Sequence, residues 1–298
     1  MIEQAAIAAG RHLTVRGVGR LLRMLYPCRP DSPRWVEGVR RRGDDLQVEI
    51  DSREEIDWAQ LFLGGYEPHM THLFEKLLPA GGVAVDVGAN VGAHTLTLAT
   101  LVGTQGRVLA FEPNPATRRK LQVNLSLNAL SQVDVFGVAL GNTNEQLQLR
   151  VPRSDSLQAS NPGLASLHAL DTPHDLVNVD VRVFDEVVDG LKLERLDVVK
   201  IDVQGYEQAV LEGMKSSLRR FCPAILFEYE DWAWEKSGSH WLRVYEDLSV
   251  CGYELWWIRS GRRTATFVPI SDATPVAGHF EVLALPRGSG LAAIGRTS

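Results

Sequence analysis

The sequence predicts an α/β protein with a doubly wound, mostly parallel sheet that begins near residue 80. Short runs rich in β-branched residues alternate there with helical segments, which is typical of a parallel sheet covered by helices on both faces. The run at 83–87 is apolar enough for a buried strand and leads through a glycine-bearing turn into a helix. After the next strand, at 107–111, a helix is expected to begin at Pro115, where the missing N–H of proline costs nothing.

The other elements follow from the same patterns. Further expected strands, recognised by apolar runs or by alternation, are 45–51, 133–140, 146–151, 179–183, 197–203, 224–229, 253–258 and 280–285. Expected helices, recognised by period and by flanking Gly or Pro, are 66–78, 92–102, 115–129, 206–219 and 241–250. The chain therefore divides into an N-terminal extension (1–62) with a basic helix and a short strand, a main domain (63–286) and a flexible tail (287–298).

Composition indicates a globular protein of a reducing compartment. Hydrophobic residues make up 45% and charged residues 23% of the chain, as in ordinary soluble domains. No apolar run approaches the roughly 20 residues that span a bilayer, and the arginine-rich first 30 residues do not resemble a secretion signal. Cys28, Cys222 and Cys251 fit neither a disulfide framework nor zinc-ligand spacing. We therefore expect a cytoplasmic protein.

Charge is distributed unevenly along the chain. Residues 1–43 hold nine arginines against three acids, so the net charge of −6 leaves about −12 for the remainder. This acidic main body argues against nucleic acid as a partner. The basic amphipathic stretch at 1–30 has two interpretations: it contacts a membrane surface or a partner, or it packs its apolar side on its own domain.

The first candidate binding motif is VDVGANVGAHT, at 85–95. Glycines allow a ligand close to the backbone, and the N–H groups that start a helix favour an anionic group. The spacing from Asp86 through Gly88 to Gly92 differs from the Gly-x-Gly-x-x-Gly turn that holds a pyrophosphate. The motif therefore suits a nucleoside with a cationic amino-acid tail better than a dinucleotide.

Acidic residues end three of the expected strands. Glu112 follows the strand at 107–111, about 20 residues past the glycine turn, where a carboxylate can accept hydrogen bonds from both ribose hydroxyls. Lys200 and Asp202 interrupt the apolar strand at 197–203, and Glu228 lies near the end of the next one. Buried charges must be paired or used. Ion pairs of Lys200 with Asp202 or Glu228, or a solvated Glu228, are the structural alternatives to a functional role.

Together these segments resemble the FkbM family of S-adenosylmethionine (SAM) dependent methyltransferases. The matching motifs, within about Gly65 to Tyr229, are VDVGANVGAHT, FEPNP, VAL followed by Gly141, NPGLASL and KIDVQGYEQAVLEGM. The resemblance implies a class I methyltransferase (Rossmann-like) fold whose sheet has seven strands, the last antiparallel. It also implies O-methylation of a small hydroxylated acceptor, such as a sugar or a secondary metabolite.

The resemblance also assigns cofactor contacts. Asp86, Gly88, Asn90 and Gly92 would line the methionine side of SAM, with Thr95 near its carboxylate. Glu112 would hold the ribose, with Asn114 in the same motif, and Ala139 and Leu140 would pack near the adenine. Tyr66 and Glu67 would close over the site, and Asp202 would border it.

For catalysis we expect Asp202 to accept the proton of the acceptor hydroxyl or to orient that hydroxyl, with Glu228 and His94 as reserves. A packed or cofactor-flanking imidazole is the alternative role of His94, because the positive end of its helix disfavours the imidazolium. No metal is expected, because no histidine cluster supports a metal site. A metal ion bound by Asp202 and Glu228 is the alternative that the sequence leaves open. The alternative functions are a SAM-binding protein without turnover and a nicotinamide-dependent oxidoreductase.

Overall fold

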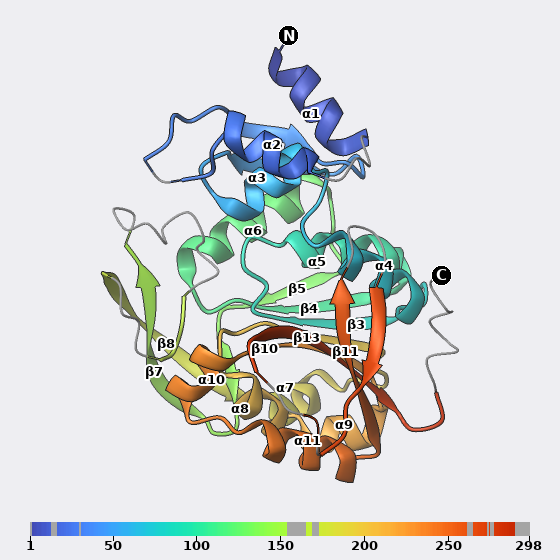
Figure 1. Ribbon diagram of the computed structural model, residues 1–298. Helices are drawn as coiled ribbons and strands as arrows, with labels where there is room; N and C mark the ends of the chain where they lie inside the picture. Colours follow the sequence, from blue (N-terminus) through green and yellow to red (C-terminus); the bar gives the residue numbers. More distant parts are fainter. Residues whose placement is uncertain are drawn as a thin grey trace.

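The main sheet has eight strands and is mixed, with a parallel centre (Figure 1). The computed structural model describes residues 2–12, 17–29, 31–153, 165–168, 173–260, 265–272, 274 and 277–289. In spatial order the strands are β12 (Ala265–Pro269), β11 (Tyr253–Ser260), β13 (His279–Pro286), β10 (Ala224–Glu230), β9 (Val198–Ile201), β3 (Val83–Val87), β4 (Arg107–Phe111) and β5 (Val133–Phe136). The five strands from β10 to β5 are parallel, and β13 runs antiparallel between β10 and β11.

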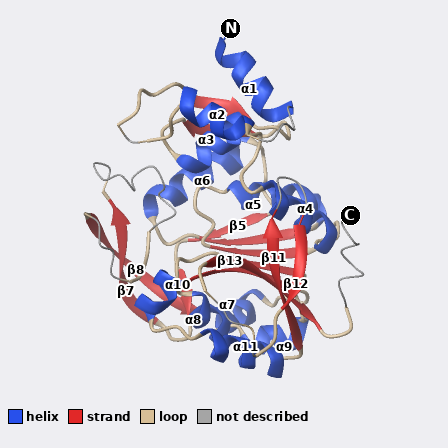
Figure 2. Cartoon of the chain, in the orientation of Figure 1, coloured by secondary structure: helices blue, strands red, loops and turns tan. Residues whose placement is uncertain are grey.

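Helices cover both faces of this sheet, as Figure 2 shows. On one face, alternate residues such as Val85, Leu109 and Ile201 form a core with α7 (Phe184–Leu191), α8 (Glu207–Glu212), α9 (Lys215–Phe221), α10 (Asp231–Ser237) and α11 (Trp241–Val250). On the other face Ala84, Val108 and Val198 pack against α4 (Pro68–Leu77) and α5 (Ala93–Val102). The predicted α/β class with helices on both faces is therefore confirmed.

Seven strands were expected in the sheet, and the structure adds an eighth at its edge. β11 continues to Ser260, beyond the expected end at residue 258, and forms an antiparallel pair with β12. β12 is short and ends at Pro269, so no long alternating run marked it in the sequence.

The third strand, expected as one element at 133–140, is two strands in different sheets. β5 ends at Phe136, and β6 (Ala139–Gly141) pairs with β8 (His174–Val183) in a three-stranded sheet completed by β7 (Glu145–Pro152). Gly137 and Val138 separate the two strands, and a Cβ on Gly137 would lie 2.8 Å from the Arg118 guanidinium. The strands expected at 146–151 and 179–183 are present, as parts of β7 and β8.

A helix expected over 206–219 is likewise divided, into α8 and α9. The break falls at Gly213, whose backbone approaches β6 so closely that a Cβ would lie 2.0 Å from the carbonyl oxygen of Gly141. This close approach explains why a glycine interrupts an otherwise helical pattern.

The N-terminal residues pack on the outside of α5 and α6 (Pro115–Leu127). They form α1 (Ile2–His12), α2 (Val18–Leu25), the hairpin of β1 (Glu37–Arg41) and β2 (Gln47–Asp51), and α3 (Glu55–Phe62). Leu22 and Trp58 share a buried cluster with Leu96 of α5 and Leu121 of α6. The expected tail beyond residue 289 and the residues 13–16 of the expected N-terminal helix lie outside the described residues. Within the described part of the chain, no helix is long and apolar enough to cross a bilayer.

The carboxyl end of β3 meets that of β9 at Gly88. This glycine has φ 77°, and a Cβ added to it would lie 1.9 Å from the carbonyl oxygen of Asp202. Gly81 has a similar φ of 72° but has open space around it.

We therefore expect Gly88→Ala to lower the free energy of unfolding by about 3 kcal/mol or more, because backbone must move in addition to the conformational strain. Gly81→Ala is the matched control and should cost only about 1 kcal/mol, the strain of a left-handed residue. Urea denaturation of both variants measures the difference. Equal losses would contradict the steric argument.

Candidate active site

Three neighbouring parallel strands carry acidic residues at or near their carboxyl ends, and two of these acids, Glu112 and Asp202, line one pocket. Asp86 lies in β3, Glu112 directly follows β4, and Asp202 directly follows β9. The Asp202 N–H donates to the Val87 carbonyl at 3.0 Å, which extends the β3–β9 pairing into the loops. Ligands of open α/β sheets bind outside the carboxyl ends of the strands, which is where this pocket lies. Its volume is about 640 Å³ when the space open to solvent at its mouth is included.

The turn after β3 has the conformation that its glycines predicted. Gly88, Asn90 and Gly92 all have positive φ, of 77°, 51° and 93°. The N–H groups of Gly88 and Ala89 both donate to the carbonyl oxygen of Phe111 at 3.0 Å, so the turn is fastened to the end of β4. The Asn90 side-chain Oδ1 is buried and has no hydrogen-bond partner among the described residues. A polar atom of this kind is available to a ligand.

Glu112 is fixed by backbone donors on both sides. Its Oε2 accepts from the Asn90 N–H and its Oε1 from the Asn114 N–H, each at 2.8 Å. Burial raises the pKa of this carboxyl, although the two backbone hydrogen bonds oppose that shift. Glu112 lines the pocket beside Pro113, and a carboxylate offers about four lone-pair sites for hydrogen bonds.

Lys200 lies buried between two acids. Its Nζ is 3.4 Å from Asp86 Oδ1, from Asp202 Oδ2 and from the Gly88 carbonyl oxygen. Burial alone would lower the pKa of Lys200, but Asp202, Asp86 and Glu67 outweigh it and raise that pKa. The ion pair with Asp202 that the sequence suggested is therefore present, whereas no Lys200–Glu228 pair is seen. Asp202 still has 34% of its side chain exposed.

The expected cofactor residues fall into three groups, one of which is Glu67 alone, a lining residue of the second pocket described below. Gly88, Asn90, Glu112, Ala139, Leu140 and Asp202 line the pocket. Asp86, Gly92, Thr95 and Asn114 lie behind its wall: the Thr95 hydroxyl donates to Asp86 Oδ2 at 2.6 Å, and the Asn114 side chain caps α6 by accepting from Ala116 N at 3.1 Å. Gly92 packs on α6, where a Cβ would lie 2.6 Å from Leu121.

Part of the pocket wall comes from residues to which sequence reasoning assigned no role in the site. They are apolar or aromatic and belong to the three-stranded sheet, to the segment 165–168 and to the loop after β9: Leu149, Ala165, Leu167, Val203 and Tyr206. Ala165 and Leu167 belong to the NPGLASL motif, whose first four residues, 161–164, lie outside the described residues.

A second pocket adjoins the first and is strongly acidic. The two pockets share four lining residues, Gly88, Asn90, Asp202 and Gln204. Carboxylates that line the second pocket are Glu55, Glu67, Asp202, Glu228 and Glu230. Its cationic or titratable nitrogen groups are Lys200, His94 and His279.

Gln204, which sequence reasoning missed, connects the carboxylates of the second pocket. Its Nε2 donates to Asp202 Oδ1 at 3.1 Å and to Glu228 Oε2 at 3.4 Å. The residue has φ 53°, so it forms a turn immediately before Gly205. The Gln-Gly pair at a strand end was the only trace of this role in the sequence.

Glu228 also contacts His279, which lies on β13. Burial and then the neighbouring Asp202 raise the pKa of Glu228, and the hydrogen bond to Glu228 raises the pKa of His279. Glu228, Glu230 and His279 bring ligand atoms within 4.8 Å of one another, so they could hold a metal ion, an arrangement that the sequence did not suggest.

His94 is buried and engaged. Its Nε2 lies 2.9 Å from Glu67 Oε2, and the rings of Tyr66 and Phe74 are 5.7 and 5.6 Å away. Burial would raise the pKa of Glu67, but His94, Lys200 and His69 lower it to about 2. Glu67 is the N-cap residue of α4 and has φ 45°. Its contact with His94 holds the Glu67 side chain at the wall of the second pocket.

The strand order, with a parallel centre and β13 antiparallel between β10 and β11, is that of the class I methyltransferase fold. A family model described as the methyltransferase FkbM domain matches residues 86–255, more than half of the chain. The chain belongs to this methyltransferase family, whose methyl donor is SAM. The resemblance seen in the sequence motifs is confirmed.

Individual relatives cover this chain only in part. The AMB antimetabolite synthetase AmbE of Pseudomonas aeruginosa is 30% identical over 52% of this chain and 9% of its own length. Hexuronic acid methyltransferase AglP of Haloferax volcanii is 30% identical over 57% of this chain and 64% of its own length. The chain therefore spans less than two thirds of these two relatives. The 2-O-methyltransferase NoeI of Sinorhizobium fredii is 24% identical over 72% of this chain and 82% of its own length.

Among solved structures, an FkbM methyltransferase from Methylobacillus flagellatus KT aligns with 95% of this chain and 58% of its own, at 16% identity and a TM-score of 0.43. The fold assignment rests on the strand order described above.

Glu207 holds the loop after β9, which lines the first pocket. Its Oε1 accepts from the N–H groups of Val203 and Gly205 at 3.0 and 3.2 Å, and burial raises its pKa from 4.5 to about 7. The unfolded chain therefore releases this proton at lower pH than the folded chain, so the wild type loses stability as pH rises from about 4.5 to about 7.

Glu207→Gln removes this titration. We expect the free energy of unfolding of the variant, relative to the wild type, to rise between about pH 5 and about pH 8. Urea denaturation at the two pH values measures it. A difference that does not change with pH would contradict the raised pKa.

Proposed function

We propose that this protein transfers a methyl group from SAM to a hydroxyl of a small acceptor, a sugar or a secondary metabolite. The observation that carries the proposal is the meeting of two pockets at Asp202, Gly88, Asn90 and Gln204. One pocket has the acidic and apolar lining that a nucleoside needs, and the other has the carboxylates that hydroxyl groups bind. Methyl transfer requires two ligands to meet end to end, and this arrangement allows it.

The first pocket fits SAM by its donor and acceptor groups. The Glu112 carboxylate can accept from ribose hydroxyls, and Ala139, Leu140 and Phe111 offer an apolar surface for the adenine. The unpartnered Oδ1 of Asn90 suits the cationic amino-acid end. SAM supplies, when bound, a methyl group activated on a sulfonium centre.

Asp202 is the proposed general base. It lines both pockets, it is partly exposed, and its two oxygens are oriented by Gln204 and Lys200. In this position it can take the proton of an acceptor hydroxyl as the oxygen attacks, which makes a poor nucleophile effective. Glu228 is a reserve base. His94 is the weaker reserve, because its Nε2 already contacts Glu67.

The acceptor class is supported by the lining of the second pocket and by two relatives. Carboxylates such as Glu67 and Glu228 accept hydrogen bonds from several hydroxyls at once, which suits a polyhydroxylated ligand. The names of two relatives state a hexuronic acid as substrate and a 2-O position as the site of methylation. A SAM-binding protein without turnover would need no such second pocket, and a nicotinamide-dependent oxidoreductase would need a different glycine spacing.

We expect Asp202→Asn to lower kcat by about 100-fold or more, because a general base is lost, while binding of S-adenosylhomocysteine stays nearly unchanged. Asparagine keeps the size of the side chain, and its Oδ1 can still accept from Gln204. Glu228→Gln is the matched control and should keep most of the turnover. If Asp202→Asn turns over like the wild type, Asp202 is not the base.

The function itself is tested by binding and by product analysis. Titration calorimetry should show heat with SAM and with S-adenosylhomocysteine, and mass spectrometry of hydroxylated acceptors incubated with enzyme and SAM should show the gain of one methyl group. Heat with NADH and none with SAM would instead support an oxidoreductase. Cofactor binding without methylation of any sugar or natural product would favour the protein without turnover.

A further inference from the structure

Three side chains that can bind a metal ion meet on one face of two paired strands. Glu228 and Glu230 lie on β10, and His279 begins β13. Glu230 stands directly opposite His279 in the antiparallel pairing, and Glu228 is two residues away on the same face. One ligand atom from each residue lies within 4.8 Å of the other two, so a single ion can contact all three.

The two strands hold these ligands in position. The pairing continues beyond the three residues, because the Asp231 N–H donates to the Gly278 carbonyl at 3.1 Å. On the pocket side, Gln204 Nε2 donates to Glu228 Oε2 at 3.4 Å. Ligands that are carried by paired strands and fixed by a neighbour lose little freedom when an ion binds, so the site is prearranged.

Negative charge is less well compensated here than in the rest of the second pocket. Each of three other acids of that pocket has its own cationic or imidazole partner: Glu55 with Arg23, Glu67 with His94 and Asp202 with Lys200. Glu228 and Glu230 share the imidazole of His279. In addition, Glu230 Oε2 is buried and has no hydrogen-bond partner among the described residues. A buried oxygen of this kind, beside a second carboxylate, calls for a bound cation.

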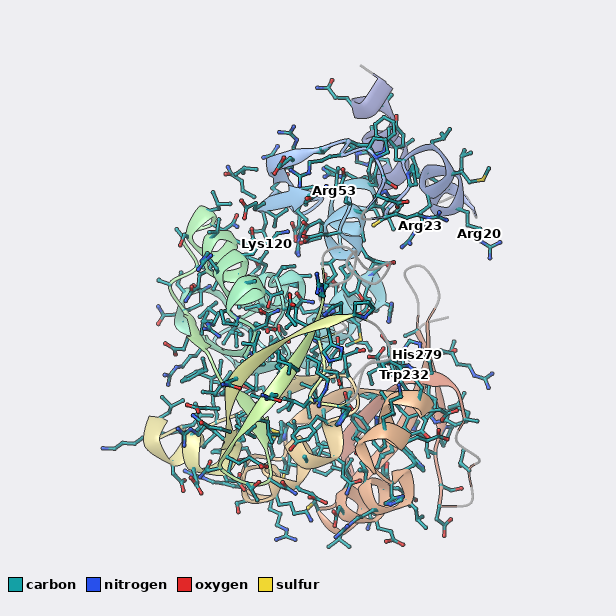
Figure 3. All side chains as sticks on the ribbon, turned by 90° about the vertical axis from the view of Figure 1, so that its left-hand side faces the viewer. Arg20, Arg23, Arg53, Lys120, Trp232 and His279 are labelled. Atoms are coloured by element: carbon teal, nitrogen blue, oxygen red, sulfur yellow. The ribbon has the colours of Figure 1, made fainter. Side chains whose placement is uncertain are left out.

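The site faces solvent through the second pocket. All three ligands line that pocket. The side chain of His279 is 58% exposed and that of Glu228 is 21% exposed. Figure 3 shows His279 on the side of the molecule that also carries Trp232. An ion can therefore reach these ligands without a change in the fold.

We propose that Glu228, Glu230 and His279 bind a divalent transition-metal ion, Zn²⁺ or one of similar ligand preference, in the wall of the second pocket. Carboxylate oxygens together with an imidazole nitrogen are ligands that Zn²⁺ takes, whereas Mg²⁺ and Ca²⁺ prefer oxygen ligands alone. Three protein ligands leave a coordination position open to water or to an oxygen of a bound molecule. The imidazole thus favours a metal ion over an organic ammonium group, which the carboxylates alone would also attract.

The ion lies beside the proposed general base. Gln204 donates to Glu228 and also to Asp202, so the two carboxylates are neighbours around one amide. An acceptor with adjacent oxygens, such as a vicinal diol or a hydroxy acid, can bind the ion and present a hydroxyl to Asp202. This consequence rests on the proposed function, and it predicts that loss of the ion raises KM for the acceptor rather than lowering kcat. Binding of the ion does not rest on that function.

The test is titration calorimetry of the full chain, first dialysed against EDTA, with ZnCl₂ and with MgCl₂. We expect one Zn²⁺ per chain and much weaker binding of Mg²⁺. Glu230→Gln and His279→Gln, made singly, should each weaken Zn²⁺ binding by about tenfold or more, because a ligand is lost. Glu230→Gln leaves the contact of His279 with Glu228 in place, so it separates the loss of a ligand from the loss of that contact.

The matched control is His72→Gln/Glu75→Gln. It removes the same kinds of group from a pair on α4, 3.5 Å apart, and should bind Zn²⁺ like the wild type. Zn²⁺ should also raise the thermal unfolding temperature of the wild type and of this control, and raise that of the two site variants less. Cooperative unfolding without metal verifies that each variant is folded.

Three results would overturn the proposal: no saturable Zn²⁺ binding, an equal loss of Zn²⁺ affinity in the control, or heat with an alkylamine and none with Zn²⁺. The last result would assign the acidic wall to a cationic acceptor. Because the titration needs neither SAM nor turnover, a chain that binds Zn²⁺ and methylates nothing supports the metal site and refutes the proposed function. An active enzyme without Zn²⁺ binding does the reverse.

Discussion

The site depends on one buried cation, the Lys200 ammonium. Placing Asp86, with no exposed side chain, in the middle of the sheet would be costly without a compensating charge. Lys200 supplies that charge from the neighbouring strand and also reaches Asp202 and the Gly88 carbonyl. Lys200 thereby joins the ends of β3 and β9 and fixes the Asp202 carboxylate, which faces both pockets.

Around this point the loops are fastened mainly by their own backbones. The turn after β3 is held by the Phe111 carbonyl, Glu112 is held by two N–H groups, and the loop after β9 is held by Glu207. These contacts leave the ligand-facing groups oriented before any ligand arrives, which lowers the entropic cost of binding. Rigid strand ends and prearranged polar groups are what a transfer reaction governed by alignment requires.

The sequence predicted the α/β class, the main strands and the three acidic strand ends, because these depend on local patterns that repeat at fixed spacing. It missed the division of 133–140 between two sheets, since Val138 and Leu140 look like the continuation of a buried strand. It also missed His279 and the wall residue Leu149, which belong to strands paired at long range, and Gln204, whose partner Glu228 comes from the neighbouring strand β10. No local pattern in one sequence records which distant strand end will lie beside another.

The contact between Gly213 and Gly141 has a consequence for the dimensions of the first pocket. The two backbones touch with no side chain between them, so the kink between α8 and α9 sets how far β6 can lie from the main sheet. Leu140, next to Gly141, forms part of the pocket wall. The helix break at Gly213 therefore influences the width of the first pocket from behind its wall. A larger residue at position 213 would push β6 away and change that width, although residue 213 does not line the pocket.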